Sequence, residues 1–392
     1  MEDRPLDLAV VIEHLGTSGG QERVAYELVA RWAARHRVTV YCYHAPEDLA
    51  LWGVRTVLVR PAPRGKLLGA ILFPRLVSRV LSPSHDIIFA QGGNCPKCNF
   101  SLFHTCHPLR LETMRLVALE RRRPPSFRER INMVVRRRFF IPRERRTLLH
   151  CRGRAYAVSQ RMADDLRRVH GLGPQDVLVA PNGVDLTTFN PAVRKNRNLA
   201  RASLGIAQGD LLALFMGGLW WEKGLHIALQ AVAAARRPWK LAVVGSHADA
   251  RAFQKLTADL GLASRVVFCG RTERPQDFYA AADCLMLPSR FEGFPLVSVE
   301  AAACGVPVLI SREGNPGGLF EDGAGYILPR EPQAFAAALD ELAGEPSQRK
   351  KLGAAAAARA RLFTWDRQAQ ILEEGFHRYL SSRRSEPEIP QP

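Results

Sequence analysis

The sequence predicts an α/β protein made of two doubly wound, Rossmann-like domains. Short apolar runs rich in β-branched residues alternate with helical patterns, and this alternation begins again near residue 211. The chain has 392 residues, more than one compact core normally serves, and its apolar fraction of 47% is that of a globular protein. Ligands of open α/β sheets bind beyond the carboxyl ends of the strands, so we expect a ligand-binding cleft between the domains.

The first domain is expected to contain seven strand-like segments. They cover residues 8–15, 38–43, 56–59, 86–91, 101–106, 155–159 and 177–182. The first of them leads into the Gly-rich sequence TSGGQER and an amphipathic helix that reaches about Arg35. This alternation of strand and helix is that of a doubly wound domain.

The second domain repeats the pattern with six strand-like segments. They cover residues 211–218, 240–245, 265–270, 284–289, 307–311 and 325–329, with helical segments between them. The polar stretch Asn190–Ala207 lacks strong periodicity and is interpreted as the linker. The tail 384–392 is expected to be disordered.

The sequence indicates neither a membrane span nor a secretory signal. No apolar run approaches the roughly 18 residues that a span needs, and acidic residues stand near the N-terminus where a signal peptide carries basic ones. The eight cysteines fall mostly in strand-like runs, which favours reduced core thiols over a disulfide framework. We therefore expect a cytoplasmic protein.

Positive charge is concentrated in the segment 110–154. The net charge of the chain is +17, and this segment alone holds 15 arginines, no lysine and four glutamates. Such density favours an anionic partner, and we expect peripheral attachment to the inner face of the plasma membrane. The alternative is a solvated helical face in an arginine-rich protein. Nucleic acid is not expected, because no RNA- or DNA-reading motif is present.

Two glutamates in the stretch SRFEGFPLVSVEAAACGVPVLIS, residues 289–311, are strong candidates for ligand binding. The pattern predicts a strand end, a tight loop and a helix that Gly305 closes, with Pro295 in its first turn. Glu292 then lies just before the helix and Glu300 inside it. A carboxylate there can accept hydrogen bonds from a vicinal diol, and the helix start favours anionic ligands. In the structural alternative, Glu300 pairs with a core arginine and Glu292 caps the helix.

This stretch resembles the E-x7-E signature of the family 4 glycosyltransferases, which have the two-domain GT-B architecture. Further motifs stand in that family's order: GGQER (19–23), AVS (157–159), PNGVD (181–185), FMGG…EKG (215–224) and FTWD (363–366). The resemblance covers almost the whole chain. It implies an acceptor domain, 1–189, and a nucleotide-sugar domain, 190–365, with a C-terminal helix, 366–383, that joins the first domain.

The resemblance assigns roles to residues of the second domain. Glu300 would hold the ribose hydroxyls, and Glu292 would lie beside the donor sugar. Lys223 would neutralise the donor diphosphate, where a cation stabilises the developing charge. An exposed lysine at a helix start is the alternative for Lys223. Further donor contacts are expected from Gly293, Phe294, Leu296, Arg271 and Asn315.

In the first domain the resemblance points to Gly19, Gly20 and His107. The glycines form a bare turn that would let backbone N–H groups approach a phosphate or sugar, although a tight strand-to-helix turn would need them too. His107 follows an apolar strand end and would lie close to the donor sugar, with His104 as a residue that packs nearby or supports the site without touching the ligand. The expected catalytic residues are Glu292, Lys223 and His107.

Two other motifs have competing interpretations. A zinc site is suggested by Cys95, Cys98, Cys106, His104 and His107. Only one CxxC is present and the family needs no metal, so we expect no metal site. Trp220 and Trp221 either stack on a ligand or pack in the core.

The chain departs from the family pattern after the FMG strand. Gly218 stands where many relatives carry an arginine, so one of two diphosphate cations is missing. Arg271 and Arg290 are candidate substitutes.

A second departure lies in the loop REGNPGGLFEDG. Gly318 stands where relatives often place a glutamate five residues before the final glycine. A donor contact is either lost there or taken over by Glu313 or Asn315, and either change could alter the choice of donor.

We expect a bacterial, retaining glycosyltransferase that moves a hexose from a nucleotide-diphosphate sugar, first of all a UDP-sugar, to a hydroxyl group. The expected acceptor is a glycan or a lipid-linked, lipopolysaccharide-like molecule, and no cofactor is expected. Alternatives are a mannosyltransferase that uses GDP-mannose and an inactive scaffold in a glycan assembly complex. An epimerase or phosphorylase of the same fold would lack the E-x7-E pairing or need a pyridoxal lysine, and neither signature is found.

Overall fold

The computed structural model describes residues 4–17 and 19–385, which form two compact units. Unit 1 contains the chain up to 111, residues 126–182 and the chain from 365 onward. Unit 2 contains residues 112–125 and 183–364. The tail that we expect to be disordered, 384–392, lies outside the described residues from 386 onward, and the last helix reaches Ser385.

Unit 1 is built on a parallel sheet that has seven strands within the described residues. The strands are β1 (Asp7–Val11), β2 (Arg37–Cys42), β3 (Arg55–Leu58), β4 (Ile87–Gln91), β5 (Phe100–Phe103), β6 (Ala155–Ala157) and β7 (Val177–Val179). Their spatial order is β3-β2-β1-β4-β5-β6-β7. Central strands such as β4 are buried along their whole length, which explains their continuous apolar sequence.

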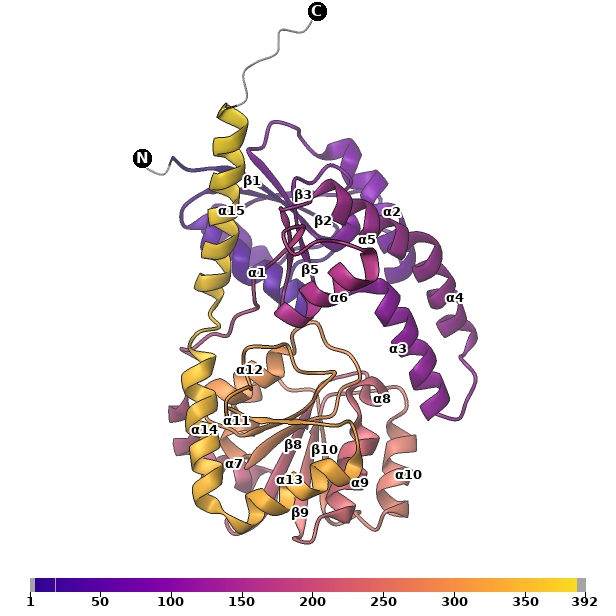
Figure 1. Ribbon diagram of the computed structural model, residues 1–392, viewed down its shortest axis with the longest axis vertical. Helices are drawn as coiled ribbons and strands as arrows, with labels where there is room; N and C mark the ends of the chain where they lie inside the picture. The colour runs from indigo at the N-terminus through magenta and orange to yellow at the C-terminus, as the bar shows by residue number, and fades with distance from the viewer. Residues whose placement is uncertain (1–3, 18, 386–392) are drawn as a thin grey trace, which may run out of the picture. The chain divides into compact units, whose positions relative to one another are not determined.

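Helices cover the sheet of unit 1, as Figure 1 shows. They are α1 (Gly20–Ala33), α2 (Lys66–Val80), α5 (Ile141–His150), α6 (Gln160–His170) and α15 (Trp365–Ser385), whereas α4 (Phe127–Val135) buries none of its residues and lies away from the sheet. A π-helical turn, η3 (Arg136–Phe140), joins α4 to α5, and short 3₁₀ segments are η1 (Glu47–Trp52) and η2 (Gly92–Asn94). Helix α3 (His107–Glu120) begins after β5, and its residues from 112 onward count with unit 2.

The C-terminal helix α15 packs against α1 in unit 1. The Arg31 guanidinium lies 2.9 Å from Asp366, and Arg35 lies 2.8 Å from Glu373. The buried rings of Trp32 and Phe376 contact each other in a tilted arrangement, with centroids 5.5 Å apart. Apolar packing and charge pairing together therefore hold the last helix on the first unit.

Unit 2 has the same architecture around a parallel sheet with six strands in the described chain. The strands are β8 (Leu211–Met216), β9 (Trp239–Val244), β10 (Val266–Gly270), β11 (Cys284–Leu287), β12 (Val308–Ser311) and β13 (Tyr326–Leu328), in the order β10-β9-β8-β11-β12-β13. Its helices are α7 (Arg197–Ser203), α8 (Trp220–Lys223), α9 (Leu225–Ala234), α10 (Ala250–Asp259), α11 (Pro275–Ala281), α12 (Leu296–Ala303), α13 (Pro332–Gly344) and α14 (Pro346–Ala360). The prediction of two Rossmann-like domains is confirmed.

Each sheet has a switch point, which is the pair of neighbouring strands from which the chain proceeds toward opposite edges of the sheet. In unit 1 it lies between β1 and β4, and in unit 2 it lies between β8 and β11. Loops that leave these neighbouring strands diverge to opposite faces of the sheet, which opens a crevice for a ligand at the carboxyl ends. The topology therefore indicates one candidate ligand-binding site in each unit.

The segment 190–207, which we expected to be a linker, is helical for most of its length. It forms the 3₁₀ helix η4 (Pro191–Asn196) and then α7. Three arginines of this segment donate to backbone carbonyls at the end of α11, and Arg201 also bonds the Asp283 carboxylate. The linker prediction is wrong because these polar side chains hold the segment against unit 2, a contact that local periodicity does not report.

The described helices are all too short or too polar to cross a membrane.

Candidate active site

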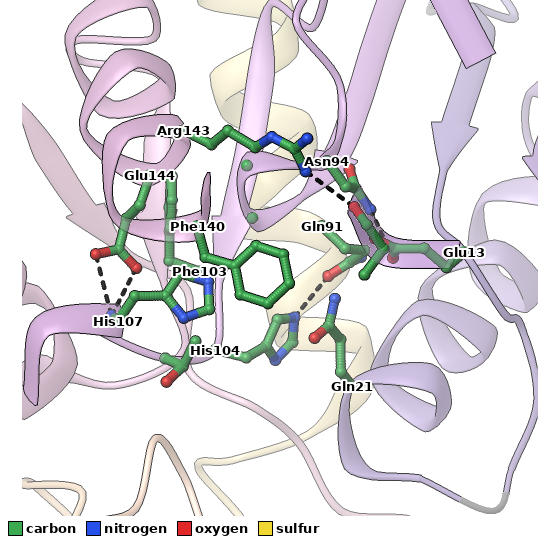
Figure 2. A pocket seen from close by; sticks show the side chains of 14 residues that line it. Glu13, Gln21, Gln91, Asn94, Phe103, His104, His107, Phe140, Arg143 and Glu144 are labelled. Carbon is green, nitrogen blue, oxygen red and sulfur yellow. Dashed lines mark hydrogen bonds between the residues drawn. The ribbon is translucent and has the colours of Figure 1, made fainter. Parts of the chain in front are cut away.

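A pocket of about 150 Å³ lies at the switch point of unit 1. Figure 2 shows its polar side chains arranged around the ring of Phe140. The lining residues are Glu13, Gln21, Ala70, Gln91, Gly92, Gly93, Asn94, Phe103, His104, Thr105, His107, Phe140, Arg143 and Glu144. Several of them follow β1, β4 or β5 directly, which is why the pocket forms at the carboxyl ends of these strands.

Two side chains of this pocket keep polar atoms without a partner among the described residues. Asn94 donates to Glu13 Oε2 at 3.1 Å, and His104 Nε2 lies 2.5 Å from Gln91 Oε1. Gln91 Nε2 and Asn94 Oδ1 are buried and make no hydrogen bond. An unpaired buried donor or acceptor costs about 1–3 kcal/mol, so these atoms are sites where a polar ligand would stabilise the pocket.

His107 is anchored at both its backbone and its ring. It is the first residue of α3, and its N–H donates to both oxygens of Glu144, at 2.9 and 3.1 Å. The Arg136 guanidinium donates to its ring Nδ1 at 2.5 Å. Both Glu144 and Arg136 come from the Arg-rich segment, so the charge cluster partly serves to fix this pocket.

Both pocket histidines are held neutral. Burial lowers the pKa of His104 to about 3, and burial together with the charge of Arg136 lowers the pKa of His107 to about 3. A neutral imidazole with so low a pKa offers hydrogen bonds at pH 7 but takes up no proton. His104, expected to pack near the site or to support His107, lines the same pocket as His107.

Gly19 and Gly20 stand at the start of α1. Gly20 is the first residue of the helix, and Gly19 precedes it in an extended conformation. A Cβ on Gly19 would lie 2.1 Å from the Glu22 carboxylate, whereas a Cβ on Gly20 would meet nothing within 4 Å. The next residue, Gln21, lines the unit 1 pocket. The Glu22 carboxylate therefore lies against Gly19 at the helix start, and the predicted approach of a phosphate or sugar to these glycines stays a prediction.

The cysteines that suggested zinc do not gather with the pocket histidines. Cys98 Sγ instead lies 3.8 Å from Cys151 Sγ, and both thiols are buried. Among the described residues, the group with ligand-like spacing is Cys106, Glu144 and His170. Glu144 is already bonded there by His170 at 2.8 Å and by the His107 N–H. We therefore assign this group a hydrogen-bonding role at the start of α3.

In unit 2, Lys223 and Glu292 form an ion pair at the switch point. Lys223 Nζ lies 2.5 Å from Glu292 Oε1, and the Ser289 hydroxyl donates to the same oxygen at 2.8 Å. Lys223 ends α8, which follows β8, and Glu292 lies in the loop after β11. Because β8 and β11 are neighbours, two residues from separate sequence motifs meet beyond their carboxyl ends.

Two glycines make room for this ion pair. A Cβ on Gly217, which has a φ of +141°, would lie 2.7 Å from Lys223 Cδ, so the lysine side chain passes directly over this residue. A Cβ on Gly224, with a φ of +78°, would lie 2.2 Å from the Pro288 carbonyl oxygen. Only glycine allows such close approach together with a positive φ. The GG and EKG motifs thus bring α8 against the loop that carries Glu292.

Glu300 lies on the buried side of α12, where 5% of the residue is exposed. The Tyr279 hydroxyl donates to its Oε2 at 2.8 Å. This tyrosine, at the end of α11, orients the carboxylate, and no motif in the sequence pointed to it. Gly293, in the loop before α12, and Leu296, the first residue of α12, are partly buried, and Phe294 packs on Phe363 with ring centroids 5.8 Å apart.

The remaining predicted donor contacts lie in two loops of unit 2. Arg271 is exposed and donates to the Ser246 hydroxyl at 3.0 Å. Asn315 donates to Glu321 Oε1 at 2.9 Å. Burial alone would raise the pKa of Glu321, but hydrogen bonds from Asn315 and from loop N–H groups outweigh it and lower the pKa. The loop that lacks a glutamate at Gly318 therefore still presents a charged carboxylate, which the sequence reasoning missed.

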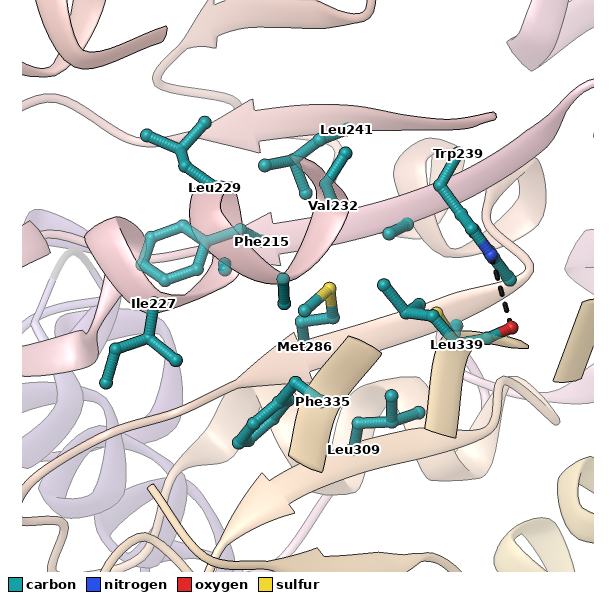
Figure 3. Close-up of a cluster of buried hydrophobic side chains, with 14 of the residues drawn as sticks. Phe215, Ile227, Leu229, Val232, Trp239, Leu241, Met286, Leu309, Phe335 and Leu339 are labelled. Atoms are coloured by element: carbon teal, nitrogen blue, oxygen red, sulfur yellow. Dashed lines mark hydrogen bonds between the residues drawn. The ribbon is translucent and has the colours of Figure 1, made fainter. Parts of the chain in front are cut away.

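Trp220 belongs to the hydrophobic core of unit 2 rather than to a ligand site. It is 2% exposed and belongs to the buried hydrophobic cluster of unit 2, with its ring centroid 5.5 Å from that of Phe253. The same cluster, part of which Figure 3 shows, includes Phe215 and Met286 from the strands, and Leu339 from α13, whose carbonyl accepts from Trp239 Nε1 at 3.2 Å. Trp221 is partly buried against this core.

The low pKa values of His104 and His107 predict a loss of stability in mild acid. The unfolded chain protonates each ring near pH 6.5, whereas the folded chain does not until about pH 3. Stability is therefore fully present above pH 6.5 and falls as the pH drops toward 3, by up to about 1.4 kcal/mol per pH unit for each ring. Thermal unfolding at pH 7.5 and 5.0 should show a smaller difference in Tm for His104→Asn/His107→Asn than for the wild type.

The exposed His150 on α5 provides the control. His150→Asn should keep the wild-type difference in Tm between the two pH values. An undiminished difference in the double variant would show that these rings do not govern the acid sensitivity.

Two family models match the chain. The model described as Glycosyltransferase Family 4 matches residues 18–188, and the model described as Glycosyl transferases group 1 matches residues 196–359. Curated relatives include D-inositol 3-phosphate glycosyltransferases of Streptomyces griseus, 34% identical over 265 residues, and of Kineococcus radiotolerans, 32% identical over 246 residues. These matches cover 60% and 57% of this chain and 56% of each relative, so the chain spans about half the length of the curated relatives it matches.

Solved structures of similar fold agree with the family models. WaaG, a glycosyltransferase involved in lipopolysaccharide biosynthesis, has a TM-score of 0.74 at 18% identity, covering 93% of this chain and 99% of WaaG. Anabaena HepE in complex with UDP-glucose has a TM-score of 0.69 at 21% identity, covering 96% of this chain and all of HepE. At these identities the likeness shows the shared fold. The family 4 model and the group 1 model together match most of the chain, and the chain belongs to the family 4 glycosyltransferases.

Proposed function

We propose that the protein is a retaining glycosyltransferase that moves a hexose from a nucleoside-diphosphate sugar to an acceptor hydroxyl. The observation that carries this proposal is the Lys223–Glu292 pair, 2.5 Å apart at the switch point of the unit 2 sheet. A cation and a carboxylate at the end of a parallel sheet suit a ligand with both a diphosphate and sugar hydroxyls.

In this proposal each side chain of unit 2 binds one part of the donor. The Lys223 ammonium faces the diphosphate and stabilises the negative charge that grows as the bond from the sugar C1 to the phosphate oxygen breaks. Glu292 accepts hydrogen bonds from the sugar, and Glu300 accepts them from the ribose diol. Lys223 supplies the countercharge, so we propose that transfer needs no metal, and activity should persist in excess chelator.

The acceptor hydroxyl attacks C1 on the face that the diphosphate leaves. Its proton passes to the departing phosphate oxygen while the new bond between C1 and the acceptor oxygen forms, so the anomeric configuration is kept. This assignment of the proton to the phosphate oxygen agrees with the state of His107, because a pKa of about 3 leaves His107 unable to take the proton near neutral pH.

A UDP-sugar is the donor that we propose. Support comes from the fold shared with HepE, which has been solved with UDP-glucose. A GDP-mannose-dependent transferase remains the alternative donor class, since Gly218 and Gly318 change the polar surroundings of the site.

The acceptor, in this proposal, presents a compact polyol to the pocket of unit 1. A volume of about 150 Å³ suits a single six-carbon ring, and the unpaired Gln91 Nε2 and Asn94 Oδ1 suit hydroxyl groups. The curated relatives are named for an inositol phosphate and WaaG acts in lipopolysaccharide biosynthesis, so cyclitols and lipid-linked sugars are the acceptor classes to test.

A donor panel tests the proposal. UDP-, GDP- and ADP-sugars should be compared by thermal shift and by donor hydrolysis in the wild type, Lys223→Ala and Glu300→Gln, of which the last retains the hydrogen bond from Tyr279. UDP-sugars should raise the wild-type Tm, and Lys223→Ala should lower kcat about 10²- to 10³-fold. Equal responses of all three proteins would contradict the site, a response to GDP-mannose alone would favour the alternative donor, and no hydrolysis of any donor would favour a scaffold.

Gly217→Ala should inactivate the enzyme without removing a functional group. The added Cβ would lie 2.7 Å from Lys223 Cδ at a strained φ, so the ammonium must move away from Glu292. A displacement of about 1 Å is expected to lower kcat about 10²-fold. Gly218→Ala is the matched control, because its Cβ would meet nothing closer than 3.9 Å, and equal kcat values for the two variants would contradict this account.

We also propose that α4 attaches the protein to an anionic membrane surface. Phe127, Ile131 and Val134 are spaced to share one face of α4 and are 78%, 38% and 65% exposed. Exposed arginines flank this stripe at positions 128, 130, 137 and 138. An exposed apolar stripe bordered by arginines suits the interface of a bilayer that contains anionic lipids.

Binding to vesicles checks the membrane proposal. Phe127→Ser/Val134→Ser should weaken partitioning into phosphatidylglycerol vesicles about tenfold, and 0.5 M NaCl should weaken it further by screening the arginines. Leu51→Ser is the control, since Leu51 is 85% exposed on η1, away from this segment. Equal binding to phosphatidylcholine vesicles, or binding that salt leaves unchanged, would contradict the proposal.

A further inference from the structure

Arg330 lies beside the backbone of both strand-end segments that carry the unit 2 ion pair. It follows β13, and its side chain is 7% exposed. Its Nε donates to the Pro288 carbonyl at 3.0 Å, and its Nη2 lies 3.5 Å from the Trp221 carbonyl. Its Nη1 donates to Glu120 Oε1 at 2.5 Å. One guanidinium therefore joins two backbone segments and one carboxylate.

The two carbonyls belong to the segments that hold Lys223 and Glu292. Trp221 lies on α8, two residues before Lys223, and Pro288 directly precedes Ser289, whose hydroxyl bonds the Glu292 carboxylate. A further tie crosses the same gap, because the Arg290 N–H donates to the Glu222 carbonyl at 2.9 Å. The spacing between the ammonium and the carboxylate is thus set by backbone contacts on which Arg330 acts directly.

Glu120 supplies the countercharge. It accepts from both Arg330 and Arg290, and His226 Nε2 lies 3.8 Å from its other oxygen. Burial alone would raise the pKa of Glu120, but hydrogen bonds from Arg330 and Arg290, with the charge of Arg330, outweigh it and lower the pKa. Arg290, a candidate for the missing diphosphate cation, is therefore already paired with a carboxylate in this structure.

We propose that Arg330 is a positioning residue for sugar transfer, which fixes the distance between Lys223 and Glu292 by holding the Trp221 and Pro288 carbonyls, with Glu120 as its countercharge. This role rests on the proposed function of the Lys223–Glu292 site. Arg330 itself touches backbone and Glu120, and it acts on the reaction only through the two segments that it ties together.

The chemistry of arginine explains why this position suits no other cation. Its planar guanidinium presents five donors in fixed directions and can bond two carbonyls and a carboxylate at once, whereas a lysine ammonium is a point charge on a flexible stem. A buried ion pair by itself adds little to stability, so Arg330 is better explained by geometry than by folding energy. Misplacement of reacting groups by about 1 Å can cost about 10²-fold in rate.

Arg330→Lys in the full chain tests the geometry while it keeps the charge. We expect kcat for transfer from the donor that the wild type uses to fall about 10- to 100-fold, while the Kd for UDP, measured by calorimetry, changes less than about threefold. The matched control is Arg201→Lys, since Arg201 is also buried in unit 2 and bonds backbone carbonyls and the Asp283 carboxylate. This control should lower Tm and leave kcat unchanged.

The double variant Arg330→Met/Glu120→Gln separates position from charge. If Arg330 served only to neutralise Glu120, removing both charges would restore kcat, whereas we expect the double variant to stay as slow as Arg330→Met. Restored activity, or an Arg330→Lys variant whose kcat is unchanged or falls only as in Arg201→Lys, would overturn the proposal. A wild type that turns over no nucleotide-sugar would refute the proposed function and this role with it, whereas an active wild type with an equally active Arg330→Lys would refute this role alone.

Discussion

The ion pair between Lys223 and Glu292 is the interaction on which the site of unit 2 depends. Both side chains are largely removed from water, with 19% and 14% of their surfaces exposed, so each charge relies on the other. The pair needs two glycines to form, and it keeps the lysine ammonium in place before any ligand arrives. In the proposed function, a donor diphosphate would compete with Glu292 for this ammonium, so donor binding would be coupled to the geometry of the pair.

The switch point of unit 1 carries a pocket with a different set of side chains. Its pocket is lined by amides, by two histidines that burial keeps neutral and by a carboxylate paired with Asn94. Arg143 and Glu144 also line the pocket, so charges of both signs lie beside these hydrogen-bonding groups. The Arg-rich segment both supports the pocket and adds charge to the surface. Arg136 holds the ring of His107, while the next residues, Arg137 and Arg138, are exposed to solvent.

The fold was predictable from the sequence to a large extent, because parallel strands buried on both faces give continuous apolar runs that stand out against helical patterns. Every predicted strand segment overlaps a strand of the described structure. The linker at 190–207 was predicted wrongly, since its helices are held by arginines that bond α11, and periodicity within a segment carries no information about such contacts. Trp220 could not be assigned to core or ligand until its neighbours were known.

The candidate site was predictable only at residues that belong to a motif. Glu292, Glu300 and Lys223 stand in recognisable local patterns, and the glycines near them report the close backbone approach that the pair requires. The residues that surround them are singled out by no motif of the sequence. They are Tyr279, Ser289, Glu120 and Arg330, and their importance comes from the contacts that they make. Partners of this kind come from distant strands and helices, and no spacing along the chain encodes their distances.

The sequence by itself therefore determined the two-unit architecture, the family and the chemical types of the groups at each strand end. Only the tertiary structure decided which of those groups meet, which are neutral and which backbone segments are tied together. The physical reason is that residue type and periodicity act locally, whereas ion pairing, desolvation and positioning arise when the sheet brings separate strand ends side by side.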